Sequence, residues 1–308
     1  MEAFAIPFLL LVGSLLALQA AANVQLSAAM ASPFGASTLQ LGIGAALLIA
    51  VAGGAGSLGA LGLLDEAEPW QLLGGLGSAL YITAGILLFP RLGALVAVGL
   101  FIAGQMLASL LLDGFGWLGV ERDALDAAAL IGAFAVGVGV WLIVHAQAGA
   151  GALEVAARQR GGWAVLGLAA GAVLPIQGAI NAQLNAELDA ATAVGAFSFL
   201  VATAAMALVL AGFLAAGARR PRVEPLGGVP WWGWLGGFCG ATYVTAVFLL
   251  IPEIGAAPVV VITVAGQQLA SVAVDRYGLL RLPRRAIPGR RLTGVAVLLC
   301  GVALITLL

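Results

Sequence analysis

The sequence predicts an all-α membrane protein whose ten transmembrane helices form a 5+5 inverted-topology repeat. Hydrophobic residues make up 62% of the chain and charged residues 9%, against roughly 25% charged in a soluble domain. The chain also repeats itself: the stretches that begin at Trp70 and Trp232 share about 23 of 50 aligned residues. Because each copy holds an odd number of helices, the second copy must enter the membrane from the opposite side.

Ten apolar stretches have the length of about 20 residues that crosses a bilayer core. Prolines and charged residues separate them. A cleaved signal peptide is the rival interpretation of the first stretch, but its start carries Glu2 instead of arginines. The stretches are centred on residues 5–23, 35–54, 70–89, 92–112, 125–146, 163–184, 192–215, 231–251, 254–274 and 291–308.

The repeat also defines the expected domains. Residues 1–150 form the first five-helix transmembrane repeat, residues 151–161 form a polar linker, and residues 162–308 form the second five-helix repeat. The connections between helices are short, so we expect no soluble domain.

The arginines orient the bundle. With the amino terminus outside, only Arg122 remains on the outer side, and the positive-inside rule is strongly obeyed. We therefore expect a multi-pass protein of the bacterial plasma (inner) membrane with both termini outside. The loops that then face the cytoplasm hold Arg91, Arg158, Arg160, Arg219, Arg220, Arg222, Arg276, Arg281, Arg284, Arg285, Arg290 and Arg291.

Several function classes are disfavoured. With 14 acids, 13 bases and a net charge of −1, the chain has no basic face for nucleic acid. Cys239 and Cys300 lie in apolar stretches without a second pair or a nearby histidine, so we expect no metal and no cofactor. An intramembrane hydrolase lacks a base, because the single histidine, His145, ends a helix. We do not expect an enzyme.

Two pairs of amide residues occupy matching places in the two copies. Gln19 and Asn23 are four residues apart and share one helix face, as do Gln177 and Asn181. One interpretation is that they hydrogen-bond neighbouring helices; the other is that they line a hydrated cavity and bind a polar substrate. Pro175 is expected to kink the sixth helix beside the second pair.

Four further residues are candidates for the same cavity. Tyr81 and Tyr243 lie near the middle of the third and eighth helices, too deep for the aromatic belt at the membrane surface. Gln105 and Gln267 align with each other in the fourth and ninth helices. Packing with an internal hydrogen bond is the alternative role of all four.

Asp113 and Asp275 are the aligned carboxylates of the repeat. A proton-coupled exporter would need an ionisable group reachable from both sides, and these two could serve. Both lie at helix ends, which favours snorkelling to water or capping a loop.

An ordered string of motifs runs through both halves. It comprises Gln19-x-x-x-Asn23, Pro175-Ile176-Gln177-Gly178-Ala179-Ile180-Asn181, Trp231-Trp232-Gly233-Trp234-Leu235-Gly236-Gly237, Gly240-Ala241-x-Tyr243 and Ala265-Gly266-Gln267-x-Leu269-Ala270-Ser271-x-x-x-Asp275. With this string the chain resembles the YdcZ-like family of the drug/metabolite transporter (DMT) superfamily, in its fused two-half form. The resemblance implies an inner-membrane carrier. The first half departs from the pattern where Gln40 aligns with Ser198.

These observations together predict a DMT-type transporter that moves a small neutral or amphipathic metabolite or drug-like molecule by alternating access. Its expected partners are that small-molecule substrate and the lipid bilayer, and it would work as a monomer or a homodimer. A non-transporting integral-membrane scaffold is the alternative, because the same amides could simply lock the bundle. The expected substrate-binding residues are Gln19, Asn23, Tyr81, Gln105, Gln177, Asn181, Tyr243 and Gln267.

Overall fold

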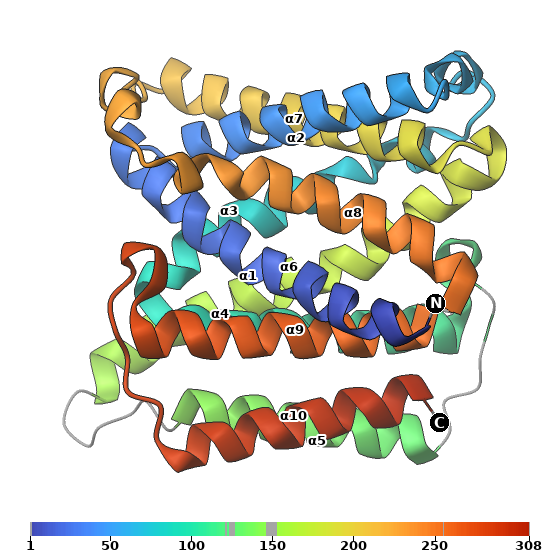
Figure 1. The fold of residues 1–308 in the computed structure, drawn as a ribbon. Helices are drawn as coiled ribbons and strands as arrows, with labels where there is room; N and C mark the ends of the chain where they lie inside the picture. The colour runs from blue at the N-terminus through green and yellow to red at the C-terminus, as the bar shows by residue number, and fades with distance from the viewer. Residues whose placement is uncertain (1, 121, 123–126, 146–152, 255, 308) are drawn as a thin grey trace.

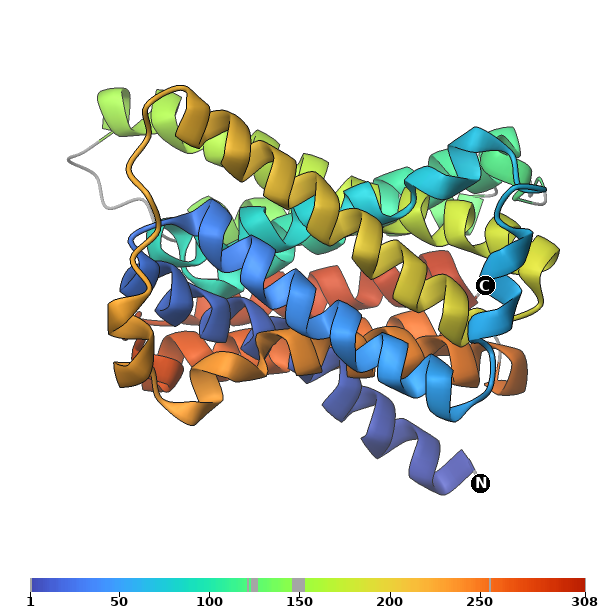
Figure 2. The ribbon, with the colours of Figure 1, turned by 90° about the horizontal axis from the view of Figure 1, so that it is seen from above.

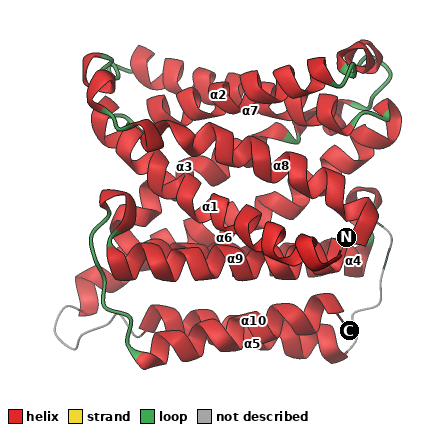
Figure 3. Cartoon of the chain, in the orientation of Figure 1, coloured by secondary structure: helices red, strands yellow, loops and turns green. Residues whose placement is uncertain are grey.

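The computed structural model describes residues 2–120, 122, 127–145, 153–254 and 256–307. In these ranges the chain is almost entirely helical, and no strand occurs (Figure 3). The α-helices are α1 (Glu2–Met30), α2 (Pro33–Gly54), α3 (Gly75–Leu92), α4 (Ala94–Phe115), α5 (Ala127–His145), α6 (Leu153–Leu188), α7 (Ala191–Ala215), α8 (Leu235–Ile254), α9 (Ala256–Tyr277) and α10 (Gly289–Leu307).

Within the described residues, eight helices are long and apolar enough to cross a membrane: α1 to α7 and α9. Large apolar side chains also cover the outside of the bundle, among them Phe134 at 75% exposure and Leu208 at 73%. Because water does not stabilise such a surface, these faces require lipid. The expected all-α membrane protein is confirmed.

Two helices begin or end away from their expected limits. α1 continues to Met30, because the polar residues at its end are still helix formers or neutral in a helix. α6 begins at Leu153 and takes in most of the segment 151–161 that was expected to be a linker. Residues 153–160 include four polar residues, Glu154, Arg158, Gln159 and Arg160, but glutamate, arginine, glutamine and the intervening alanines all have high helix propensity.

The helices form layers (Figures 1 and 2). α2 packs against α7 at one side of the bundle, and α5 packs against α10 at the other. Between these pairs, α1 contacts α8 and α9, while α6 contacts α3 and α4. The contacts of α1 with α8 and α9 thus correspond to those of α6 with α3 and α4, because both partners are shifted by five places in the order of helices.

Glycines allow the central helices to approach closely. A Cβ at Gly104 of α4 would overlap the carbonyl oxygen of Leu168 in α6. At the matching place, a Cβ at Gly266 of α9 would overlap the carbonyl oxygen of Leu10 in α1. Since lipid is as apolar as the helix surfaces, this backbone contact supplies the packing energy that holds membrane helices together.

The turn between α3 and α4 is held by residues far along the chain. The carboxylate of Asp275, at the end of α9, accepts hydrogen bonds from the N–H groups of Ala94 (2.8 Å) and Leu95 (3.1 Å). The guanidinium of Arg285 donates to the carbonyl of Pro90 at 3.0 Å. A negative group therefore caps the amino end of α4 and a positive group the carboxyl end of α3, as the helix dipoles favour.

Asp275 accordingly takes the capping role that the sequence favoured for it. It does not snorkel to water, because its side chain is only 1% exposed. Asp113 is half-buried in the last turn of α4.

Both ends of the chain lie at one end of the bundle (Figure 1). The opposite end holds three arginine–tryptophan stacks. The guanidinium of Arg91 lies 4.4 Å from the ring centre of Trp163, and those of Arg281 and Arg290 lie 5.8 and 5.4 Å from the rings of Trp232 and Trp141. Such stacks are typical of the interface between lipid and water.

Candidate functional site

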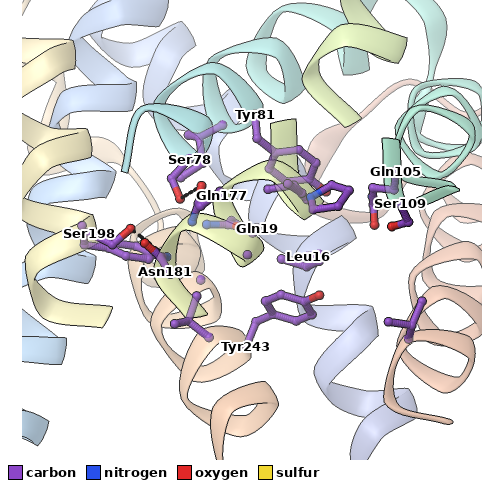
Figure 4. Close-up of a pocket in the computed structure, with 18 of the residues that line it drawn as sticks. Leu16, Gln19, Ser78, Tyr81, Gln105, Ser109, Gln177, Asn181, Ser198 and Tyr243 are labelled. Carbon is purple, nitrogen blue, oxygen red and sulfur yellow. Dashed lines mark hydrogen bonds between the residues drawn. The ribbon is translucent and has the colours of Figure 1, made fainter. Parts of the chain in front are cut away.

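A pocket of about 210 Å³ lies in the middle layers of the bundle (Figure 4). Its wall is built by seven helices, α1, α3, α4, α6, α7, α8 and α9, and so by both copies of the repeat. Its polar lining residues are Gln19, Ser78, Tyr81, Gln105, Ser109, Gln177, Asn181, Ser198 and Tyr243. Its other lining residues are Leu16, Ile82, Met106, Leu174, Pro175, Gly178, Phe199, Gly240, Val244 and Val260.

The pocket brings together six of the eight residues expected to bind substrate, namely Gln19, Tyr81, Gln105, Gln177, Asn181 and Tyr243. The other two, Asn23 and Gln267, are fully buried beside it without lining it.

The amides of α6 line the pocket and also bind neighbouring helices. Ser78 of α3 donates to the amide oxygen of Gln177 at 2.9 Å. The amide nitrogen of Asn181 donates to the hydroxyl of Ser198 in α7 at 3.2 Å. The two interpretations of these amides are therefore compatible, because one side chain hydrogen-bonds a neighbouring helix and presents its remaining polar atoms to the pocket.

The amides of α1 have different surroundings because two serines are replaced. The residue that matches Ser78 is Gly240, which lies against the amide of Gln19 and offers it no hydroxyl. The residue that matches Ser198 is Gln40. Neither amide atom of Asn23 has a hydrogen-bond partner among the described residues.

Gln40 forms hydrogen bonds with the backbone of the other copy. Its side chain donates to the carbonyl of Gly233 at 3.1 Å and accepts from the N–H of Gly237 at 2.5 Å. Gly237 lies in the first turn of α8, where free N–H groups need partners, and Gly233 lies in the short 3-10 turn that precedes α8. Gln40 therefore does not place a hydroxyl beside Asn23, as Ser198 does beside Asn181. It hydrogen-bonds the backbone at the start of α8 instead.

The tyrosine and glutamine pairs are also unequal. The amide nitrogen of Gln267 donates to the hydroxyl of Tyr81 at 2.8 Å, and the ring of Tyr81 lies 4.8 Å from that of Phe101. At the matching place, the amide nitrogen of Gln105 has no hydrogen-bond partner among the described residues. Gln105 and Tyr243 both line the pocket.

Three hydroxyl residues of the pocket were not predicted as site residues: Ser78, Ser109 and Ser198. Two of them carried a usable signal, because Ser78 precedes Tyr81 by three residues and Ser109 follows Gln105 by four, and each pair shares a helix face. Thr83, two residues after Tyr81 and on a different helix face, does not line the pocket and donates to Ser37 of α2 at 2.9 Å.

None of the described residues that line the pocket is an Asp, Glu, Arg or His. Among the described residues, no three His, Cys, Asp or Glu side chains come together as metal ligands. The side chain of His145 lies outside the described part of the chain. The chemistry available in the pocket is therefore hydrogen bonding by amides and hydroxyls, together with contact on aromatic and aliphatic surfaces.

An all-helical bundle in lipid, with a polar pocket enclosed by two copies of one repeat, defines an integral membrane protein of the transporter class. The family comparison agrees. The chain belongs to the family described as "Putative inner membrane exporter, YdcZ", whose sequence model matches residues 4–142 and 162–304. The YdcZ-like resemblance is thereby confirmed.

Two further comparisons were made, one with curated proteins and one with solved structures. No curated protein matched the chain. One crystal structure of a protein is similar to it with a TM-score of 0.57 and 21% identity, over 98% of this chain and 97% of the other. At that identity the likeness extends to the fold alone.

Proposed function

We propose that this protein is a ten-span carrier of the inner membrane that moves a small neutral or amphipathic molecule by alternating access. The pocket between the two copies would be the substrate site. The observation that carries the proposal is that amide and hydroxyl groups from both copies converge on one cavity at the centre of a membrane bundle. Transporters built from inverted repeats bind their substrates at such an interface.

Two findings support a 5+5 arrangement with residues 1–150 and 162–308 as its halves. The family match falls into two segments separated by residues 143–161. Several helix contacts repeat under a shift of five: α4 with α6 corresponds to α9 with α1, and α3 with α6 corresponds to α8 with α1. An odd number of helices per half then makes the two halves opposite in orientation.

The charge distribution supports an orientation with both termini outside. Arg91, Arg281 and Arg290 stack on tryptophans at the end of the bundle away from the chain termini. The positive-inside rule assigns that end to the cytoplasm.

The size and lining of the pocket favour a small uncharged substrate. A volume of about 210 Å³ is below the roughly 300–1,000 Å³ that is typical for drug-sized ligands. A charged substrate would lose its hydration without gaining a counter-charge, which is costly in a low-dielectric site. Asp275 lies outside the pocket and caps α4, so we assign it a structural role and not proton transfer.

The test begins with the substrate. Metabolites are profiled in a bacterial host with and without the protein, and the compounds that change are measured for uptake into liposomes containing the purified chain. Gln177→Leu and Asn181→Leu, combined, should lower this flux about tenfold or more, because each leucine removes a hydrogen bond to the substrate. Gln183→Leu is the matched control, since Gln183 donates to Gly119 outside the pocket.

Undiminished flux in the correctly inserted double variant would show that these two amides have no role in transport. The absence of flux for every compound in the wild-type protein would favour the scaffold alternative.

A further inference from the structure

Polar side chains gather at two opposite ends of the pocket. Asn181 and Ser198 lie at one end, and Gln105 and Ser109 lie at the other (Figure 4). Between the two ends, Gln19, Leu16, Tyr81 and Tyr243 line the wall in the same view. The two ends are therefore polar, and the wall between them combines aromatic and apolar surface with the amide of Gln19.

At the first end, some of the polar groups are already hydrogen-bonded to other side chains of the protein. Asn181 donates to Ser198, and Ser78 donates to the oxygen of Gln177. The amide nitrogen of Gln177 is not used in that bond, and it remains a donor for a ligand. This end therefore keeps free hydrogen-bonding capacity and is held in place by its own helix-to-helix bonds.

The second end lacks such internal bonds. The amide nitrogen of Gln105 is buried and has no hydrogen-bond partner among the described residues. Ser109 lies one turn further along α4, on the same helix face. An unpaired buried amide is unfavourable, so a ligand that offers it an acceptor oxygen gains more than the same ligand would gain at a paired amide.

The middle of the pocket is bounded by Leu16 and by the rings of Tyr81 and Tyr243. The hydroxyl of Tyr81 accepts a hydrogen bond from Gln267 and keeps its own proton as a donor. The middle of a ligand therefore meets mainly ring and aliphatic surface, with the amide of Gln19 and the tyrosine hydroxyls beside it.

We infer that the substrate is an uncharged molecule with a hydrogen-bonding group at each end and an apolar middle. This inference rests on the proposed transport function and names the substrate class of the same pocket. Asn181, Ser198 and Gln177 bind one end of the molecule, and Gln105 and Ser109 bind the other. The volume of about 210 Å³ limits the molecule to the size of a small metabolite.

The experiment measures binding to the full chain in lipid nanodiscs, with empty nanodiscs giving the background from lipid. The probes are three radiolabelled series of four to eight carbons: linear diamides, the monoamides of equal length, and the corresponding diamines. Equilibrium dialysis gives each dissociation constant. For the best-fitting length, the diamide should bind at least about tenfold more tightly than its monoamide, as one further hydrogen bond to an unpaired amide allows. The diamines, which are charged at both ends, should not bind.

Gln105→Leu should remove this preference. In that variant the diamide and the monoamide should bind with about equal affinity, each through one amide group at the opposite end of the pocket. Gln183→Leu should preserve the tenfold preference, because Gln183 lies outside the pocket. A variant that fails to fold would lose monoamide binding as well, so the monoamide reports on the fold.

Equal binding of diamides and monoamides at every length would overturn the inference, as would a lack of binding by both series. A Gln105→Leu variant that keeps the preference for diamides would also overturn it. The transport proposal is judged separately by the flux of the Gln177 and Asn181 double variant. Flux that depends on these amides, together with equal binding of the two probe series, would retain the carrier and reject the two-ended substrate.

Discussion

The carboxylate of Asp275 accepts a hydrogen bond of 2.8 Å from the N–H of Ala94, although 181 residues separate them along the chain. The second carboxylate oxygen accepts from Leu95, so the end of α9 caps the beginning of α4. A helix terminus inside the bundle thus finds its partner in the opposite copy of the repeat.

Replacing this cap should weaken the fold. We expect Asp275→Ala to lower the free energy of unfolding by about 1–2 kcal/mol, the usual effect of losing a helix cap. SDS titration of the purified protein in mixed micelles measures the change. Asp65→Ala is the control, because Asp65 is exposed; equal stability of the two variants would contradict the capping role.

The close helix contacts at Gly104 and Gly266 should be equally sensitive to a methyl group. Each Cβ would meet a backbone carbonyl of the facing helix, and overpacking of this kind costs about 1–3 kcal/mol. Thermal denaturation of Gly104→Ala and Gly266→Ala should show similar decreases in Tm. In Gly212→Ala the new methyl meets nothing within 4 Å, so an unchanged or slightly raised Tm is expected there. A decrease in only one of the two paired glycines would argue against equivalent contacts.

The bond between Tyr81 and Gln267 should be measurable by a double-mutant cycle. Tyr81→Phe leaves the amide of Gln267 buried without its acceptor, which we expect to destabilise the protein by about 1–2 kcal/mol. In a protein that already carries Gln267→Leu, Tyr81→Phe should be nearly neutral, because no amide then remains unpaired. Tyr277→Phe, at an exposed tyrosine, provides the reference. Additive effects of the two substitutions would mean that the bond contributes nothing.

Orientation can be tested by cysteine labelling in a background with Cys239→Ala and Cys300→Ala. Glu66→Cys lies in the connection between α2 and α3, and Arg220→Cys lies between α7 and α8. With both termini outside, a membrane-impermeant maleimide should label the first in intact cells and the second only after lysis. The reverse pattern would invert the topology.

The sequence predicted those features of the pocket that depend on helix periodicity. Spacing of four residues correctly placed Gln177 and Asn181 on one face, and alignment of the copies paired Tyr81 with Tyr243. Such signals are local or repeat along the chain, so a single sequence contains them.

Features that depend on contacts between the copies could not be predicted. Asn23 shares a helix face with Gln19 but lies just beyond the edge of the pocket, and Gln267 is occupied by Tyr81. Asp275 was expected either to snorkel to water or to cap a loop, and it caps α4; its partners Ala94 and Leu95 contribute only backbone atoms, which carry no side-chain signal. The early start of α6 was missed because polarity marks the edge of the membrane and not the end of a helix.

The packing of α1 against α9 sets an order of events during biosynthesis. α1 ends at Met30 and α9 at Tyr277, so about 250 residues are synthesised before the partner of α1 is complete. At a translation rate of roughly 5–20 residues per second, the amino-terminal helix waits for tens of seconds at most with the face that packs against α9 uncovered. Nascent chains of this protein therefore pass through a stage in which lipid or an insertase must shield that face, and truncations within α9 should expose α1 to quality-control proteases.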